Sequence, residues 1–420
     1  MSTEYKNILY LGGLVSNTPE DKIPDGKASD IYNIDMSIDG LIQTQKGSEL
    51  FGNEITEAGN ITRMYLYKKN FGTLKRVKLR VRDNGTTSIL QWYNATQWED
   101  LKTGLTTGAI MGFGPANGNN GATVNLMVHC NGKDNFMSWN GATSTVVSVT
   151  SNTIVCSNLT TSTPNEGFGS TGSVMVNGTE YAYTGITTDT LTGVTPDPTT
   201  QNPDVLSGVA QVITEHASLD EGNILLVDQG KLFLSGIDGD ESTILYTKTG
   251  NVLDFVVAGD GALGDAGFIT VMDGGGAITA LESRGKNGTI IHKNDFVQQY
   301  ARTDNGTTVS ERFDTLSDLD GSGATNLKAL TSVNQRSYFM TGNEGLQNLS
   351  KASQDDSINL NSVIDAIRRT LKDYDFDNSA VAYYPPKRVV LIACKDSVDR
   401  EQNNKVIAYY VKQTENGYTG

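Results

Sequence analysis

The sequence predicts an all-β protein, an irregular β-propeller with an inserted small β-module and one α-helix near residues 358–374. Three observations lead to this prediction: a composition rich in turn-forming residues, apolar strands that recur at a regular spacing, and tight turns directly after most of these strands. Glycine supplies 45 of the 420 residues and hydrophobic residues only 37%, which favours many short strands joined by turns.

The spacing of the strands is the strongest indication of the fold. Six apolar runs have reference positions that lie 47, 108, 58, 48 and 52 residues apart, at Val77, Val124, Leu232, Ile290, Tyr338 and Val390. A β period of about 40 to 50 residues is typical of propeller blades, because one blade cannot bury both of its faces and has to stack on its neighbours. We therefore expect roughly five to seven irregular blades.

The one doubled interval contains a segment rich in Thr, Ser and Asn, from Val149 to Ala210, and without its 62 residues the interval returns to 46. Inside it, Asn177–Gly178 stands between two alternating runs, which is a strong hairpin pattern. We predict an inserted small β-domain at 149–210. The remaining divisions are an N-terminal arm with the first propeller strands (1–60), blades at 61–148, and further blades at 211–420.

A helix is predicted at 358–374 because apolar residues there recur on one helical face: Ile358, Leu360, Val363, Ile364, Ile367, Leu371 and Tyr374. The basic residues Arg368, Arg369 and Lys372 lie on the other side. Two interpretations stay open for them. They complement the dipole at the end of the helix, or they form a basic face for a neighbouring subunit.

Charge and hydropathy exclude several classes of protein. The net charge of −15 repels a polyanion at long range, which argues against a protein that grips nucleic acid tightly. The N-terminus lacks the pattern of a secretory signal, so we expect synthesis in the cytoplasm. The longest apolar run, Val389 to Cys394, is far shorter than the roughly 20 residues that a membrane span needs.

The sequence offers no constellation of catalytic residues. Its three histidines have no metal-ligand spacing, its three cysteines are widely separated, and no Walker-type or nucleophile motif is present. Gly259–Gly264 matches GxGxxG, but a predicted strand follows it where a dinucleotide site needs a helix. We expect no enzyme activity, no cofactor and no metal. Acidic pairs such as Asp238 and Glu241 would suit a glycosidase, but in so acidic a chain a solvated surface is the simpler interpretation.

The most unusual charge feature is the stretch from Arg63 to Arg82, which holds eight basic residues and no acidic one. If its end is a strand, the period of two places Arg76, Lys78, Arg80 and Arg82 on one solvent-facing side and Val77, Leu79 and Val81 on the core side. Three interpretations stay open: a solvated or edge-protecting face, contact with an acidic neighbouring subunit, or contact with DNA phosphates. We take these four basic residues as candidates for assembly or DNA contact.

Two stretches resemble a known family. The segment Ile23–Asp35, followed by Asp39–Gly47, resembles the opening of phage tail nozzle and packaged-DNA stabilisation proteins, although Gln45 and Lys46 replace the Arg and Pro that are usual there. The stretch Gly222–Phe255 is similar to a later part of the same family. The segment Gly178–Gly185 resembles a small β-module that is common in phage tail proteins.

This resemblance implies a structural virion protein of a phage tail, made in the host cytoplasm and assembled as a ring, commonly of six copies. It implies a position at the tail or the head-to-tail channel, where the protein retains packaged DNA and forms part of the ejection conduit. The implied partners are other copies of the chain, tail or portal and adaptor proteins, and viral DNA in transient, non-specific contact. The alternatives are a receptor- or glycan-binding propeller and, further away, a glycoside hydrolase.

Overall fold

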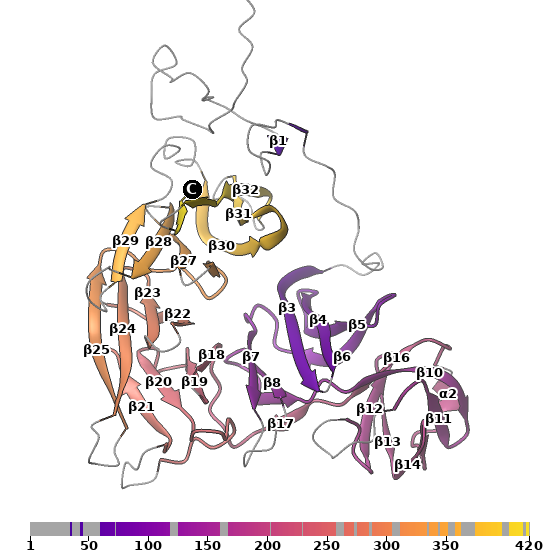
Figure 1. The fold of residues 1–420 in the computed structure, drawn as a ribbon. Coiled ribbons are helices and arrows are strands. Elements are labelled where there is room, and N and C mark those ends of the chain that lie inside the picture. The colour runs from indigo at the N-terminus through magenta and orange to yellow at the C-terminus, as the bar shows by residue number, and fades with distance from the viewer. Residues whose placement is uncertain are drawn as a thin grey trace, which may run out of the picture. The chain divides into compact units, whose positions relative to one another are not determined.

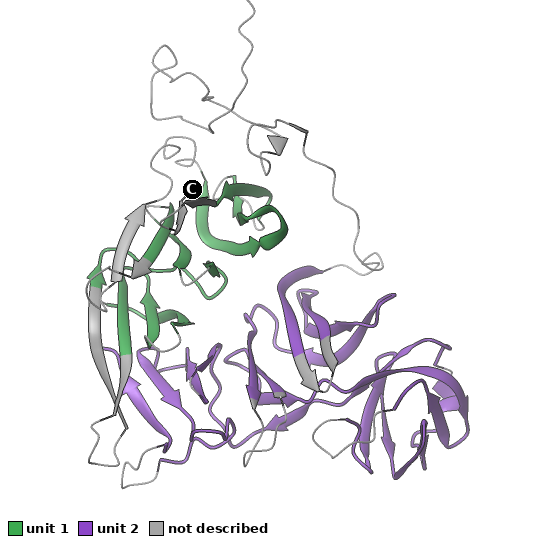
Figure 2. Cartoon of the chain, in the orientation of Figure 1, with its two compact units in different colours: residues 1–49, 272–302, 313–420 green, residues 50–271, 303–312 purple. Residues whose placement is uncertain are grey.

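The computed structural model confirms an all-β protein with the β-propeller fold, and its described residues form six blade sheets (Figure 1). The chain divides into two compact units: one comprises Met1–Glu49, Met272–Arg302 and Phe313–Gly420, the other Leu50–Val271 and Thr303–Arg312 (Figure 2). The structure describes residues 34–35, 43–44, 59–71, 73–117, 125–159, 167–201, 203–228, 230–257, 264–272, 275–284, 288–304, 311–333, 336–342, 345–351, 358–362, 374–396, 403–414 and 417–419.

The first three blades belong to the unit that contains Leu50–Val271, and each is a four-stranded antiparallel sheet. The first blade consists of β3 (Asn60–Phe71), β4 (Thr73–Asp83), β5 (Ser88–Tyr93) and β6 (Trp98–Leu105). The second consists of β7 (Gly112–Asn117), β8 (Asn125–Cys130), β9 (Phe136–Trp139) and β17 (Thr214–His216). The third consists of β18 (Ile224–Asp228), β19 (Lys231–Ser235), β20 (Thr243–Tyr246) and β21 (Gly267–Thr270).

The other unit contains most of the fourth blade and all of the fifth and sixth. The fourth blade consists of β22 (Ile278–Ser283), β23 (Thr289–Lys293), β24 (Phe296–Asp304) and β25 (Glu311–Asp320). The fifth consists of β26 (Leu330–Val333), β27 (Arg336–Thr341), β28 (Gly345–Lys351) and β29 (Ile358–Ser362). The sixth has β30 (Asp375–Tyr384), β31 (Val389–Lys395) and β32 (Lys405–Tyr410), with a 3₁₀ turn at Pro385–Lys387. Two short hairpins, β1 (Ile34–Asp35) with β2 (Gln43–Thr44) and β33 (Lys412–Thr414) with β34 (Gly417–Thr419), complete this unit.

The spacing predicted from the sequence is the spacing between the second strands of consecutive blades. The six apolar runs lie in, or lead directly into, β4, β8, β19, β23, β27 and β31. A second strand has a partner strand on both edges, and every residue of β19 and of β23 is buried. This burial on both faces produces the continuous apolar runs that make these strands visible in the sequence.

Residues Thr143–Gln211, a range slightly wider than the predicted 149–210, contain the strands of a separate seven-stranded sheet between the third and fourth strands of the second blade. Its strands, in sheet order, are β13 (Thr179–Tyr183), β12 (Gly172–Val176), β16 (Gly208–Gln211), β10 (Thr143–Thr150), β11 (Thr153–Cys156), β15 (Thr190–Thr192) and β14 (Gly185–Thr187). Its helix α2 spans Pro198–Gln201. The first and last strands pair, with Thr143 opposite Ala210, so the chain leaves and rejoins the blade at neighbouring points.

The predicted hairpin of the insertion is present. Asn177 and Gly178 join β12 to β13, with Val176 opposite Thr179, and both turn residues have positive φ angles, 48° and 76°. Two consecutive left-handed residues make the turn whose twist matches that of the flanking strands, which explains the Asn-Gly pair. The segment also has its own hydrophobic core, which includes Val146, Ile154, Phe168, Tyr181 and Leu191.

The prediction of a helix from residue 358 is wrong at its start. Residues Ile358–Ser362 form β29, which pairs antiparallel with β28, with Leu349 opposite Leu360. Ile358 and Leu360 are two residues apart, which is the strand period and not the helical one, and asparagines at 359 and 361 are poor helix formers. The rest of the predicted helix, 363–373, lies outside the described residues.

Consecutive blades within each unit share hydrophobic cores. The first and second blades enclose one core around Tyr67, Leu79 and Trp139, and the second and third enclose another around Phe136 and Leu232. In the other unit, cores join the fourth blade to the fifth and the fifth to the sixth, with buried residues that include Ile290, Phe339, Tyr338, Val390 and Ile392. Face-to-face stacking of consecutive blades therefore builds the cores within each unit.

Candidate functional site: the outer face of the first blade

The basic stretch singled out in the sequence forms the hairpin β3–β4. The two strands pair from Asn60 opposite Asp83 to Phe71 opposite Thr73, with one register shift between Ile61 and Arg63. Directly opposed residues project to the same side of an antiparallel sheet, so the register assigns each residue of the hairpin to one of two faces. We call the side that packs on the second blade the inner face and the opposite side the outer face.

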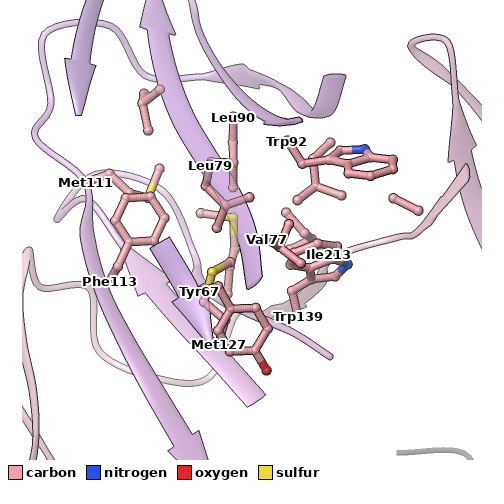
Figure 3. Close-up of a cluster of buried hydrophobic side chains, with 14 of the residues drawn as sticks. Tyr67, Val77, Leu79, Leu90, Trp92, Met111, Phe113, Met127, Trp139 and Ile213 are labelled. Carbon is pink, nitrogen blue, oxygen red and sulfur yellow. The ribbon is translucent and has the colours of Figure 1, made fainter. Parts of the chain in front are cut away.

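The inner face is the core side predicted from the alternation. Val77, Leu79 and Val81 are all buried in the core shared with the second blade. Opposite them, Tyr67 lies 6.2 Å from Trp139 and Tyr65 stacks on Phe113 at 4.8 Å, measured between ring centroids. Figure 3 shows the labelled aromatic and aliphatic side chains of this core gathered between strands of the two blades.

The outer face carries the four predicted basic residues, but not all of them point to solvent. Arg76 and Lys78 are exposed, whereas Arg80 and Arg82 are only 7% and 5% exposed. The expectation that all four side chains are solvated is therefore wrong for the last two. The reason is the length of β5, which pairs with β4 only from Leu79 to Asp83, so the side chains of β5 and β6 cover this end of the face.

Arg80 is held in a hydrogen-bonded network within the blade. Its Nε donates to Oε1 of Gln91 at 2.8 Å, and Nε2 of Gln91 donates to Oδ1 of Asp100 at 2.6 Å. The guanidinium lies over the ring of Trp98, 4.4 Å from its centroid. Burial and the nearby Arg82 lower the pKa of Arg80 to about 10, which leaves it charged at neutral pH. These contacts give Arg80 a structural role in the blade.

Sequence reasoning missed three exposed apolar residues on the same face. The register places Met64 opposite Arg80, Leu66 opposite Lys78, and Ile61 opposite Arg82. Their exposed fractions are 60%, 42% and 38%. The signal was present in β3, where Met64 and Leu66 alternate with Tyr65 and Tyr67, so that both faces of the strand are apolar.

The exposed part of the outer face is therefore amphipathic. It comprises Ile61, Met64, Leu66 and Lys68 of β3 with Arg76 and Lys78 of β4, and we use the name exposed outer face for this set. Lys68 and Arg76 stand opposite each other. The Nζ of Lys78 lies 5.3 Å from the ring centroid of Tyr93. No ion pair joins Lys68 or Arg76 to an acidic residue of the described chain.

Other side chains that could take part in chemistry, the histidines and cysteines, are mostly buried. His129 and His292 are fully buried, neither ring has a hydrogen-bond partner among the described residues, and burial lowers the pKa of each to about 3. The three cysteines are buried and free, and burial raises the pKa of Cys394 to about 11. Among the described residues, no group of three His, Cys, Asp or Glu side chains is placed to hold a metal ion.

Comparison with known proteins gives no family assignment. No family model and no curated protein matches the chain. Among solved structures, it is similar to Hsv2 of Kluyveromyces lactis, with 10% identity, a TM-score of 0.26, and coverage of 79% of this chain and 94% of that one. A second structure of Hsv2 matches with 9% identity and a TM-score of 0.24, and the match covers 79% of this chain and 94% of the Hsv2 chain. No helix of the described residues is long and apolar enough to span a membrane.

Proposed function

We propose that the chain is a structural protein of a phage tail, located in the virion at the tail nozzle or the head-to-tail channel. In this role it retains packaged DNA and forms part of the ejection conduit, with other copies of itself and tail, portal or adaptor proteins as partners. The role is geometric and needs no catalytic residue. An acidic channel lining lets DNA slide, because like charges deny the duplex any fixed ionic contact.

One observation carries the proposal. The stretch Gly222–Phe255, which resembles the tail nozzle family, coincides with three consecutive strands of the third blade, β18, β19 and β20. The resemblance therefore covers three paired strands of one blade and not scattered residues. The family-like opening, residues 23–47, also contains the β1–β2 pair, with Ile34 opposite Thr44.

The glycan-binding alternative receives less support. Carbohydrate sites usually present exposed aromatic platforms, and the three tryptophans of the chain, Trp92, Trp98 and Trp139, are all buried in the first two blades. Trp98 is covered by Arg80, and Trp139 donates from Nε1 to the carbonyl oxygen of Gln211 at 2.7 Å.

Electron microscopy of the purified full chain tests the proposal. The expected result is a ring with a central channel, and particles assembled with the chain should keep their DNA while particles without it release DNA. Compact monomers that bind a specific glycan on an array and leave DNA retention unchanged would contradict the proposal and favour the receptor-binding alternative.

A further inference from the structure

We propose that the inserted module, Thr143–Gln211, docks on a different protein whose contact surface is apolar at its centre and basic around it. The docking surface is formed by Val147, Val205 and Leu206, and we call these three residues the apolar tip. Within the proposed function, on which the identity of the partner rests, the apolar tip contacts a tail, portal or adaptor protein. The exposure, the backbone conformation and the charge of the module each support this contact.

The three side chains of the apolar tip are exposed on neighbouring segments of the module. Val205 and Leu206 are consecutive and 64% and 65% exposed, and Val147 is 49% exposed. The amide of Leu206 donates to the carbonyl oxygen of Val146 at 2.9 Å, which places the turn beside Val147. All three belong to the inserted module and not to a blade, so their exposure is not that of an unstacked blade face. Single exposed apolar residues are common, whereas a group of them indicates a contact surface.

Leu206 has a backbone conformation that leucine rarely adopts. The amide of Ser207 donates to the carbonyl oxygen of Asp204 at 3.0 Å and closes a four-residue turn, in which Leu206 is the third residue with a φ of 77°. Glycine or asparagine usually occupies this position, because a larger side chain clashes with the backbone when φ is positive. Glycine would make the same turn at a lower cost and would expose no apolar group. An outlier of this kind, on an exposed side chain, indicates a functional constraint.

The charge of the module identifies the chemistry of the partner. The module contains no lysine, arginine or histidine, and its acidic residues are Glu166, Glu180, Asp189, Asp197 and Asp204. Asp204 is exposed and begins the turn that carries Val205 and Leu206. An apolar surface surrounded by charge of one sign is complemented by an apolar surface surrounded by the opposite sign. The partner surface is therefore basic around its apolar centre.

The same charge disfavours other partners. Phosphates of DNA and anionic lipid headgroups repel a module that carries only acidic residues. A second copy of the chain has a net charge of −15 and is repelled at long range, and a contact between two apolar tips would bring Asp204 close to its own counterpart. A basic protein combines attraction to the acidic residues with apolar side chains that cover Val205 and Leu206.

The stability of Leu206→Gly tests whether this leucine serves the fold. Thr188→Gly is the matched control, because Thr188 is also exposed, has a positive φ of 50° and lies in another turn of the same module. Both variants remove a side chain from a left-handed residue, so the midpoint of thermal unfolding should stay within about 2 °C of wild type or rise in each. A larger fall in Leu206→Gly would overturn the inference, since the side chain would then support the module itself.

A peptide that imitates the partner surface tests the docking. The probe is a short fluorescent peptide of leucine and lysine, with a peptide of leucine and glutamate as its counterpart, and each is titrated with the full chain while fluorescence anisotropy is measured. Wild type and Thr188→Gly should bind the Leu/Lys peptide equally, and Leu206→Gly should bind it about fivefold or more weakly. Asp204→Asn should weaken binding to a smaller extent. The Leu/Glu peptide should not bind.

Four results would overturn the inference. They are equal binding of the Leu/Lys peptide by wild type and Leu206→Gly, equal binding of the two peptides by wild type, binding to phosphatidylcholine vesicles that Leu206→Gly loses, and self-association that Leu206→Gly loses. The third would assign the apolar tip to a membrane and the fourth to a second copy. Failure of the proposed function looks different, because a chain that binds the Leu/Lys peptide through Leu206 but is absent from phage particles leaves this surface standing.

Discussion

The two faces of the β3–β4 hairpin use the same strands for different purposes. The inner face places Tyr65, Tyr67, Val77 and Leu79 against the second blade, where they are buried or nearly so. The outer face is buried only where β5 and β6 cover it and is exposed beyond them. The difference teaches that the apolar content of a strand does not show which face is core, because apolar residues on both sides can mean one core and one interface.

The largest effect on the free energy of unfolding is expected from a substitution in the core that the inner face shares with the second blade. Trp139→Ala removes a ring that is 1% exposed, packs near Tyr67 and donates to the carbonyl oxygen of Gln211. The free energy of unfolding should fall by about 3–5 kcal/mol, measured by chemical denaturation. Trp139→Phe is the matched control and should cost clearly less. A loss below about 1 kcal/mol for the alanine variant would show that this core is not what joins the first two blades.

The next effect comes from the buried histidines and depends on pH. The pKa of His129 is lowered from 6.5 to about 3 in the folded chain, so the unfolded chain binds the additional proton between these values. Stability should be greatest above pH 6.5 and fall as the pH decreases toward 3. At pH 4.5 this one residue should cost about 2–3 kcal/mol.

The variant His129→Phe isolates this contribution, since carboxylates titrate in both proteins. The difference in unfolding free energy between pH 7 and pH 4.5 should be smaller in the variant than in wild type. Equal differences in the two proteins would contradict the assignment of His129 as a neutral, buried ring.

A smaller effect is expected where the outer face is covered. Arg80→Met should lower the free energy of unfolding by about 1–3 kcal/mol, because Gln91 loses a charged hydrogen-bond donor and Trp98 loses the cation above its ring. Arg76→Met, which lies on the same face beyond the covered region, is the control. Thermal unfolding that ranks the two variants equally would mean that the covered and exposed parts of this face do not differ.

The smallest effect on stability belongs to the exposed part. K68Q/R76Q should change the free energy of unfolding of the monomer by less than about 0.5 kcal/mol, since both side chains are exposed and lack ion pairs in the described chain. A monomer destabilised by more than about 1 kcal/mol would show that these cations support the fold and not a contact.

Much of the fold was predictable because second strands such as β19 and β23 are buried on both faces and leave continuous apolar runs. The outer strands were not, since an edge strand is half solvated and its pattern is ambiguous. Residues 358–362 illustrate this, because Ile358 and Leu360 fit the beginning of a helical stripe as well as a strand. Only the pairing with β28 decides between them, and pairing depends on residues distant in the sequence.

The sequence predicted which residues of the candidate site share a face of the strand, but not which of their side chains are exposed. The period of two correctly separated Val77, Leu79 and Val81 from the basic residues. Whether Arg80 is solvated depends instead on where β5 begins to pair with β4, which a single strand does not reveal. The apolar half of the face escaped for a related reason, since Met64 and Leu66 look like core residues until the fold shows that Tyr65 and Tyr67 occupy that side.

Hydrogen exchange tests the central claim most directly. The claim is that the inner face of the β3–β4 hairpin holds the first and second blades together. Amides of β4, β8 and β9 should exchange slowly in the wild-type chain, and Trp139→Ala should speed exchange in all three strands together. Faster exchange in β8 and β9 with exchange in β4 unchanged would contradict the account.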